Sequence, residues 1–328
     1  MRRFVRVYVA AAMAGLGCQG EPAGPEPHPI PPPGPHFTQP PIPVTTVARI
    51  TPIGFNNEPF PTAHTYWETC DGFVVLRSTR PCHREFQPLV APGSGVVRHL
   101  EAVADGTVSV EGPPGLLWTF GHVTPAPGLG VGSVITAGQV IATMFLDHGF
   151  DFGLINYGVE HTFIVPERYP DGYRYGQNPI AQFPDPLRTE LLTRVNSLSD
   201  PMGRLSFDIA ITASGGWFIG GAPKLWLARY VERVETRIVG VADAWAGWWW
   251  GFLAAVDPGA PDWEAITPAS GAVAVRLWTL GPDALPNPAQ PAGTLLVELT
   301  GPATLRIDWF DTHDPVSAFT GAARTYER

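Results

Sequence analysis

Lysine, cysteine and charge are all scarce in this chain of 328 residues. Charged residues make up 16% of it and the formal net charge is -9; with no basic run present, nucleic-acid binding is excluded. No lysine occurs between Cys18 and Pro223, which excludes the attachment of a cofactor to a lysine in that range. Only three cysteines are present, too few for the two pairs of a four-cysteine zinc site.

Glycine, proline and apolar residues are abundant instead. The chain has 36 glycines, 37 prolines and 45% hydrophobic residues, and its short apolar runs alternate with turn residues. This composition predicts a mainly β protein with a sizeable core. The length suggests two domains.

The amino terminus has the pattern of an export signal. Three arginines within the first six residues precede an apolar stretch over residues 5–16, which is too short to span a membrane. The small residues before a lone cysteine resemble a bacterial lipobox, so we expect a lipoprotein-type signal peptide over residues 1–18 and a lipid on Cys18. The alternative is an ordinary cleaved signal. Lipidation would anchor an exported protein to a membrane of the cell envelope.

Two further features of the amino-terminal region agree with export. Residues 19–44 are so rich in proline that we predict a solvated linker in an extended, polyproline-like conformation. Cys70 and Cys82 flank a short segment beyond it. Because exported proteins form disulfides, a disulfide between these two cysteines is a better prediction than a zinc site.

The clearest functional pattern begins near residue 89 and ends near residue 155. Its motifs are, in chain order, LVAPGSG at residues 89–95, AVADGTV at residues 102–108, Gly121-His122, and VGSVITAGQVIA at residues 131–142. In this order they resemble the LytM/lysostaphin-type zinc metallopeptidases of bacterial cell walls. The resemblance implies a LytM-like antiparallel β-sheet domain of the barrel-sandwich hybrid type, which we place at residues 45–184.

The same resemblance implies a degenerate active site. The family has His-x-x-x-Asp ahead of these motifs, and His64 and Glu68 have that spacing with glutamate in place of aspartate. The last strand of the family reads His-x-His, but here the two positions hold Gly149 and Asp151. The resemblance therefore implies His64, Glu68 and Asp151 as ligands of at most one Zn²⁺. If any activity remains, His122 is the implied catalytic residue.

The same residues and motifs also allow interpretations other than a metal site. The Gly-Gln pattern also occurs in lipoyl and biotinyl carriers, but those need a lysine that is missing here. His148 is a poor substitute for the imidazole missing at position 149, because adjacent residues of a strand point to opposite faces. An oxygen-rich ligand set is unusual for catalytic zinc, so a hydrogen-bonded cluster without metal is the alternative.

The carboxyl-terminal part predicts a second β domain. Residues 185–202 suggest a helical linker, and residues 203–328 suggest a small all-β sandwich or barrel with a hairpin about residues 301–303. Four tryptophans crowd together and cannot all be buried on one strand face: Trp245, Trp248, Trp249 and Trp250. They either bind a sugar or a partner, or share a core with the first domain.

Together these features predict an envelope lipoprotein with a peptidase-like first domain that has lost part of its active site. We expect it to bind peptidoglycan or an envelope protein without catalysis. The alternatives are a zinc-dependent cell-wall endopeptidase and a secreted carbohydrate-binding protein.

Overall fold

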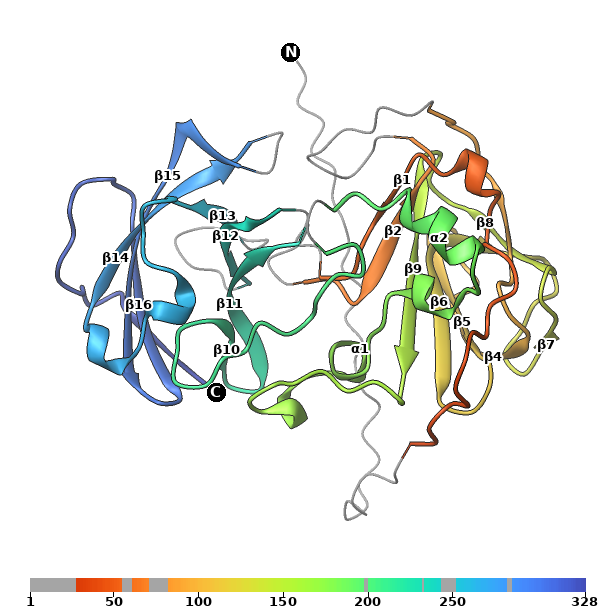
Figure 1. The fold of residues 1–328 in the computed structure, drawn as a ribbon, viewed down its shortest axis with the longest axis horizontal. Helices are drawn as coiled ribbons and strands as arrows, with labels where there is room; N and C mark the ends of the chain where they lie inside the picture. Colours follow the sequence, from red (N-terminus) through yellow and green to blue (C-terminus); the bar gives the residue numbers. More distant parts are fainter. Residues whose placement is uncertain are drawn as a thin grey trace.

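The computed structural model describes residues 28–54, 61–70, 82–197, 200–231, 233–242, 252–281 and 285–328. The predicted signal peptide with Cys18 lies outside these residues, as do Trp245, Trp248, Trp249 and Trp250. Within them, none of the helices has the length and apolar character needed to cross a membrane. Two β units lie side by side, the first running from orange to green and the second from teal to blue (Figure 1). The mainly β class and the two-unit organisation agree with the prediction.

The first unit is a nine-stranded antiparallel sheet. Its strands are β1 (Arg49–Thr51), β2 (His64–Glu68), β3 (Pro88–Val90), β4 (Gly95–Leu100), β5 (Gly106–Glu111), β6 (Leu116–Pro125), β7 (Val134–Ile135), β8 (Val140–Met144) and β9 (Gly149–Asn156). The main path is β1-β2-β9-β6-β5-β4-β7, and β8 pairs with both β3 and β6. β9 is therefore central, between β2 and β6.

Alternation along β9 separates a core face from a polar face. Phe150, Phe152 and Leu154 are buried, whereas Asp151 and Gly153 between them are half-buried. The period of two is that of a strand covered on one face. The buried side chains join an aromatic core that also includes Trp67, Trp118 and Phe120. The other face of β9 is left for polar residues.

The predicted solvated linker over residues 19–44 is wrong for residues 28–44, here called the strap, because they pack on the first unit. Phe37 and Ile42 are 2% and 1% exposed. The ring of Phe37 lies 5.7 Å from that of Phe152 and 5.2 Å from that of Phe183. The prolines predict an extended chain, but burial of the apolar residues among them stabilises a fixed position.

The segment between the units contains less helix than predicted and is attached to the sheet. It contains α1 (Asp171–Arg174), the short 3-10 helix η3 (Pro179–Gln182) and α2 (Leu187–Leu192). Beyond α2, the Ile50 amide donates to the carbonyl of Arg194 and the Asn196 amide donates to the carbonyl of Ile50. Residues 194–196 therefore pair with the β1 edge of the sheet, so this part of the predicted linker is not free.

The second unit is a closed eight-stranded β-barrel, one of the two architectures predicted for it. Its strands are β10 (Gly215–Ile219), β11 (Ala222–Tyr230), β12 (Arg233–Val241), β13 (Phe252–Val256), β14 (Val273–Leu280), β15 (Pro286–Gly301), β16 (Thr304–Phe310) and β17 (Arg324–Glu327). The hairpin predicted about residues 301–303 joins β15 and β16, with Gly301 paired to Thr304. Residues 205–211 form an irregular segment before β10, because their polar groups bond to the junction between the units.

Besides the core of each unit, a further apolar cluster joins the two units. It contains Tyr66 from β2, Tyr169 from the loop before α1, and Phe218 and Trp226 from the barrel. Tyr169 also donates a hydrogen bond to Asp208, whose carboxylate accepts from the Gly216 amide at 2.9 Å. Burial raises the pKa of Asp208 above its usual value. The barrel is thus packed against the same strand that carries His64.

Candidate functional site

Three neighbouring strands bring the predicted polar residues together. Asp151 on β9 is paired with Tyr66 on β2 and with Gly121 on β6, and His64 is paired with Gly153. Gly121 leaves space for the carboxylate, because a Cβ there would lie 3.3 Å from the Cβ of Asp151. The sheet order therefore places His64, His122 and Asp151 at one point on the polar face.

Both imidazoles approach the same carboxylate oxygen. The Nε2 atoms of His64 and His122 lie 3.3 Å and 3.5 Å from Oδ2 of Asp151. The other ring nitrogen of His122, Nδ1, lies 2.6 Å from Oδ1 of Asp105. We call His64, Asp105, His122 and Asp151 the polar cluster. It is a chain of alternating imidazoles and carboxylates.

A strained backbone holds the outer half of the polar cluster. His122 and Asp105 have φ angles of 57° and 61°, in the left-handed region that non-glycine residues seldom adopt. The ladder between β5 and β6 shifts here, since Gly106 pairs with Val123 and Thr107 with Gly121. His122 is therefore the extra residue of a β-bulge, which redirects its side chain. Such strain is typical of residues with a function.

The polar cluster is partly open to solvent. The side chains of His64 and His122 are each 32% exposed, that of Asp105 is 45% exposed and that of Asp151 is 16% exposed. Within the described residues, Oδ1 of Asp151 is buried without a hydrogen-bond partner. A buried carboxylate oxygen of this kind is costly to leave unpaired.

Glu68 does not join the polar cluster, and its prediction as a metal ligand is wrong. Its Oε2 atom lies 2.7 Å from Nε and 2.6 Å from Nη2 of Arg49, on the neighbouring strand β1. The side chains of this ion pair are 1% and 3% exposed. Glu68 is also paired with Gly149, two residues along β9 from Asp151 and therefore about 7 Å away along the strand. The guanidinium of Arg49 therefore binds the Glu68 carboxylate that a metal ion would need as a ligand.

The position of the missing imidazole is closed by backbone. A Cβ at Gly149 would lie 2.7 Å from the carbonyl oxygen of Trp67, closer than real Cβ contacts. His148 does not fill this role either, since its Nδ1 lies 2.8 Å from Oδ1 of Asp147. The hydrogen bond with His148 lowers the pKa of Asp147 below its usual value. The loss at position 149 is therefore built into the packing of β2 on β9.

The side chains present do not fit the zinc site that the resemblance implies. His64 and Asp151 are close enough to share an ion, but Glu68 is bound to Arg49 and Gly149 has no side chain. Across the parts of the chain that the structure describes, no group of three or more His, Cys, Asp or Glu side chains is placed to hold a metal ion. Catalytic zinc takes three protein ligands. The residues of the polar cluster are joined to one another by hydrogen-bond and ion-pair contacts.

Cys70 and Cys82 form a disulfide, with Cα atoms 4.3 Å apart. The Thr69 amide donates to the carbonyl of His148, and the His83 amide donates to the carbonyl of Thr69. These bonds join Thr69 to the residue that precedes β9 and His83 to Thr69.

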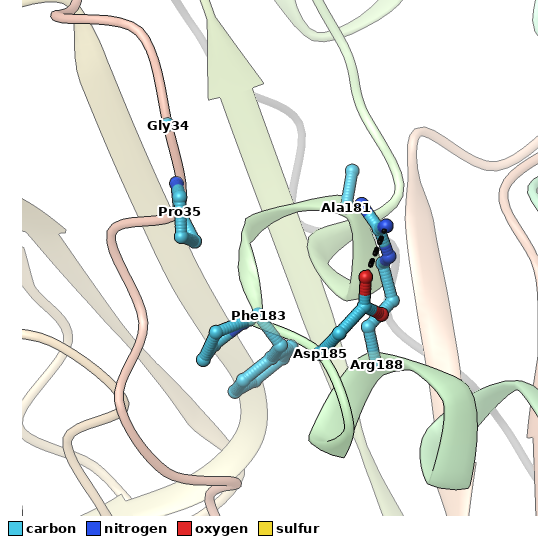
Figure 2. Close-up of a pocket in the computed structure, with 7 residues that line it drawn as sticks. Gly34, Pro35, Ala181, Phe183, Asp185 and Arg188 are labelled. Carbon is cyan, nitrogen blue, oxygen red and sulfur yellow. Dashed lines mark hydrogen bonds and ion pairs between the residues drawn. The ribbon is translucent and has the colours of Figure 1, made fainter.

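The described residues also line a cavity of about 400 Å³, which lies away from the polar cluster. It is bounded by the strap at Gly34 and Pro35 and by the segment from Ala181 to Arg188 (Figure 2). Arg188 donates to Asp185 at 3.0 Å across its edge. None of the predicted site residues lines it.

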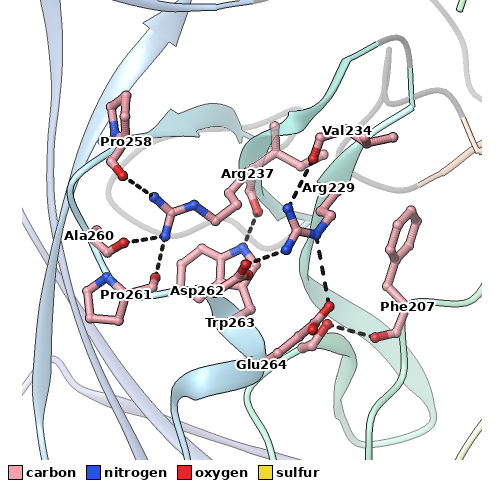
Figure 3. Close-up of polar contacts among 12 residues, drawn as sticks. Phe207, Arg229, Val234, Arg237, Pro258, Ala260, Pro261, Asp262, Trp263 and Glu264 are labelled. Carbon is pink, nitrogen blue, oxygen red and sulfur yellow. Dashed lines mark hydrogen bonds and ion pairs between the residues drawn. The ribbon is translucent and has the colours of Figure 1, made fainter. Parts of the chain in front are cut away.

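Polar residues in the barrel hold its loops together. Arg237 donates to the backbone carbonyls of Asp257, Pro258, Ala260 and Pro261, so that one loop surrounds its guanidinium (Figure 3). Arg229 pairs with Asp262 in the same loop. Trp217 and Trp226 are buried, in the barrel core and in the junction respectively. These contacts account for the barrel's fold and supply no catalytic group.

Two residues of the site were missed from the sequence alone. Asp105 lies in a motif that indicates only a turn, although the strand that it precedes, β5, and the strand that contains His122, β6, are antiparallel neighbours. Arg49 had no motif to mark it. Only the pairing of Arg49 with Glu68 across β1 and β2 reveals its role.

No model of a protein family matches the sequence, and no curated protein matches it. Parts of solved structures are similar to part of the chain. Csd3 of Helicobacter pylori is 16% identical over 38% of this chain and 31% of its own length, with a TM-score of 0.27. The catalytic domain of the antimicrobial peptidase lysostaphin from Staphylococcus simulans is 14% identical over 34% of this chain and 77% of that domain, with a TM-score of 0.23. A chain of the SpoIIQ–SpoIIIAH pore-forming complex is 13% identical over 38% of this chain and 86% of its own length, with a TM-score of 0.25.

Proposed function

We propose that the first unit is a non-catalytic, LytM-like binding module of an exported envelope lipoprotein, and that it binds peptidoglycan or an envelope protein. The observation that carries this proposal is the buried ion pair of Arg49 and Glu68. It removes an expected metal ligand by occupying it with a cation. The packing at Gly149 removes the place of a catalytic imidazole as well.

The chemistry that remains is that of a binding site. His64 and His122 are partly exposed and converge on Asp151, so they can donate or accept hydrogen bonds at one point. The carboxylate of Asp151, whose side chain is 16% exposed, can accept from a ligand amide or amine. Peptide stems of the cell wall and protein loops both carry such groups. This supports a peptide-like ligand at the polar cluster.

The binding proposal is tested with the exported chain and purified cell-wall sacculi. We expect the chain to cosediment with sacculi, and Asp151→Asn to weaken this binding about tenfold or more, since a hydrogen bond to a charged group is lost. His99→Ala is the matched control, because His99 is an exposed histidine paired with Glu101 elsewhere on the unit. If sacculi are not bound, the same comparison is made with envelope proteins captured by cross-linking in intact cells.

Catalysis is tested in the same preparation. Protein purified without chelator is analysed for zinc, and release of labelled fragments from sacculi is followed with and without added Zn²⁺. We expect release to stay at the level of the buffer control. Stoichiometric zinc together with fragment release that His122→Ala abolishes would establish the endopeptidase instead. Sugar binding that survives loss of residues 45–184 would favour the carbohydrate-binding alternative.

A further inference from the structure

The first residues of the strap pack against tyrosines and glycines of the first unit. We call this surface the tyrosine groove; it consists of Gly115, Tyr157, Gly158, Asp171 and Tyr175. The imidazole of His28 stacks on the ring of Tyr157, with centroids 3.7 Å apart and planes 13° from parallel. The ring of Tyr175 lies 6.1 Å from His28, edge to face. His28 is therefore flanked by two aromatic rings.

Polar contacts complete this environment. Nε2 of His28 lies 3.7 Å from Oδ2 of Asp171, and the same oxygen accepts a hydrogen bond from the Tyr157 hydroxyl at 2.9 Å. The side chains of His28 and Asp171 are 42% and 40% exposed. The ring of His28 is thus held by stacking and by a carboxylate at the surface of the unit.

Gly115 lets the strap backbone come close to the unit. A Cβ at Gly115 would lie 1.9 Å from the carbonyl oxygen of Pro29, and Gly115 has a φ of +85°. A Cβ at Gly158 would lie 3.4 Å from side-chain atoms of Ile30 and Pro31, at ordinary packing distance. Pro31 is buried, whereas Ile30 is 75% exposed. The groove therefore fits a proline-containing chain closely.

The strap is held in two different ways along its length. From His36 onward, backbone amides bond to the unit: those of His36 and Phe37 donate to the carbonyl of Gln182, and that of Thr38 donates to the carbonyl of Pro92. Residues 29 and 31–33 are prolines and have no amide hydrogen to donate. Residues 28–33 therefore depend on ring stacking and close packing, while Phe37 is fixed in the core.

We propose that the tyrosine groove is a binding site for proline-rich peptides that carry an aromatic or cationic ring, and that residues 28–33 of this chain are its resident and reversible occupant. Proline-rich segments dock in aromatic-lined grooves because their backbone loses little entropy on binding. The occupant can leave without disturbing the core, since Phe37 holds the rest of the strap. This site is independent of the polar cluster and of its ligand.

The test uses the exported chain and a labelled peptide with the sequence of residues 28–34, HPIPPPG, followed by fluorescence anisotropy. In the wild-type chain the resident segment competes with the peptide. His28→Ala removes the stacked ring of the occupant, so the peptide should bind this variant about two- to tenfold more tightly than the wild type. Adding Tyr157→Ala to that variant should abolish the gain. His99→Ala should bind the peptide as the wild type does.

Fold integrity is checked by the thermal midpoint and by Tyr157→Phe, which keeps the stacked ring and loses the hydrogen bond to Asp171. We expect Tyr157→Phe in the His28→Ala chain to keep most of the gain. Equal peptide binding by wild type and His28→Ala would refute the proposal, as would a gain that survives Tyr157→Ala. Dimers of the wild-type chain that His28→Ala dissociates would show that the groove holds the strap of a second copy. A vacated groove that binds chitin oligosaccharides and not the peptide would show a glycan site.

Discussion

Replacing Arg49 by methionine tests the state of Glu68 directly. Both side chains of this ion pair are nearly inaccessible, at 3% and 1% exposure, and two guanidinium nitrogens lie within 2.7 Å of one carboxylate oxygen. Removing one partner of a buried pair leaves the other charge uncompensated and typically costs about 3–5 kcal/mol. Arg49→Met should therefore lower the free energy of unfolding by about that amount. A loss of this size is a large part of the stability of an ordinary domain.

The assay is guanidinium chloride unfolding followed by tryptophan fluorescence, since Trp67 in the core is adjacent to Glu68 on β2. The double variant Arg49→Met/Glu68→Leu removes both charges and should recover most of the loss, because well-packed apolar residues can replace a buried pair. The matched control is Arg98→Met. Arg98 pairs with Glu111 at the surface, with side chains 58% and 33% exposed, so its loss should cost no more than about 1 kcal/mol.

Two outcomes would refute this reasoning. If Arg49→Met unfolds like Arg98→Met, Glu68 is not locked in a buried pair. If Zn²⁺ restores the stability of Arg49→Met, and a chelator reverses the effect, the carboxylate of Glu68 is available to a metal once the guanidinium is gone. The second result would return Glu68 to the ligand set and revive the endopeptidase hypothesis.

Three further predictions concern the strap, the junction and the closed position on β9. Phe37→Ala should cost about 3–5 kcal/mol in denaturant unfolding, whereas Phe86→Ala, at a ring 63% exposed, should stay within about 0.5 kcal/mol of wild type. Burial raises the pKa of Asp208 in the folded state. The contribution of Asp208 to stability is therefore present below the usual carboxyl pKa and is lost as pH rises through the folded-state pKa. Between acidic and neutral pH, the urea midpoint should fall less for Asp208→Asn than for wild type. Gly149→His should unfold at lower denaturant and gain no zinc-dependent release of wall fragments, because its Cβ would contact the carbonyl oxygen of Trp67; recovered release would show that β2 and β9 can separate.

Sequence patterns were sufficient for the sheet and for most of the polar cluster. Motif order placed His64, His122 and Asp151 on strands that prove to be neighbours, because β2, β9 and β6 are adjacent in the sheet. Spacing alone could not decide whether Glu68 binds a metal ion or pairs with a cationic side chain. Its position four residues after His64 is the same whether it faces a metal or the guanidinium of Arg49, and Arg49 lies on a strand that no motif marks.

The strap shows a different limit of sequence reasoning. Proline content predicts a solvated chain, since prolines cannot supply the amide hydrogens that regular structure needs. That argument ignores the few apolar residues between them. Phe37 and Ile42 are buried only when the two ends of the first unit pack together. No local sequence pattern indicates this long-range contact.

The contact of Phe37 with Phe183 has a consequence for biogenesis. The two rings belong to opposite ends of the first unit, so its aromatic interior closes only after nearly the whole unit has been synthesised. A chain that emerges amino end first must keep its earliest apolar side chains uncovered until the last ones arrive. Nascent chains stalled before residue 183 should therefore be the species most prone to aggregation and to capture by holding chaperones.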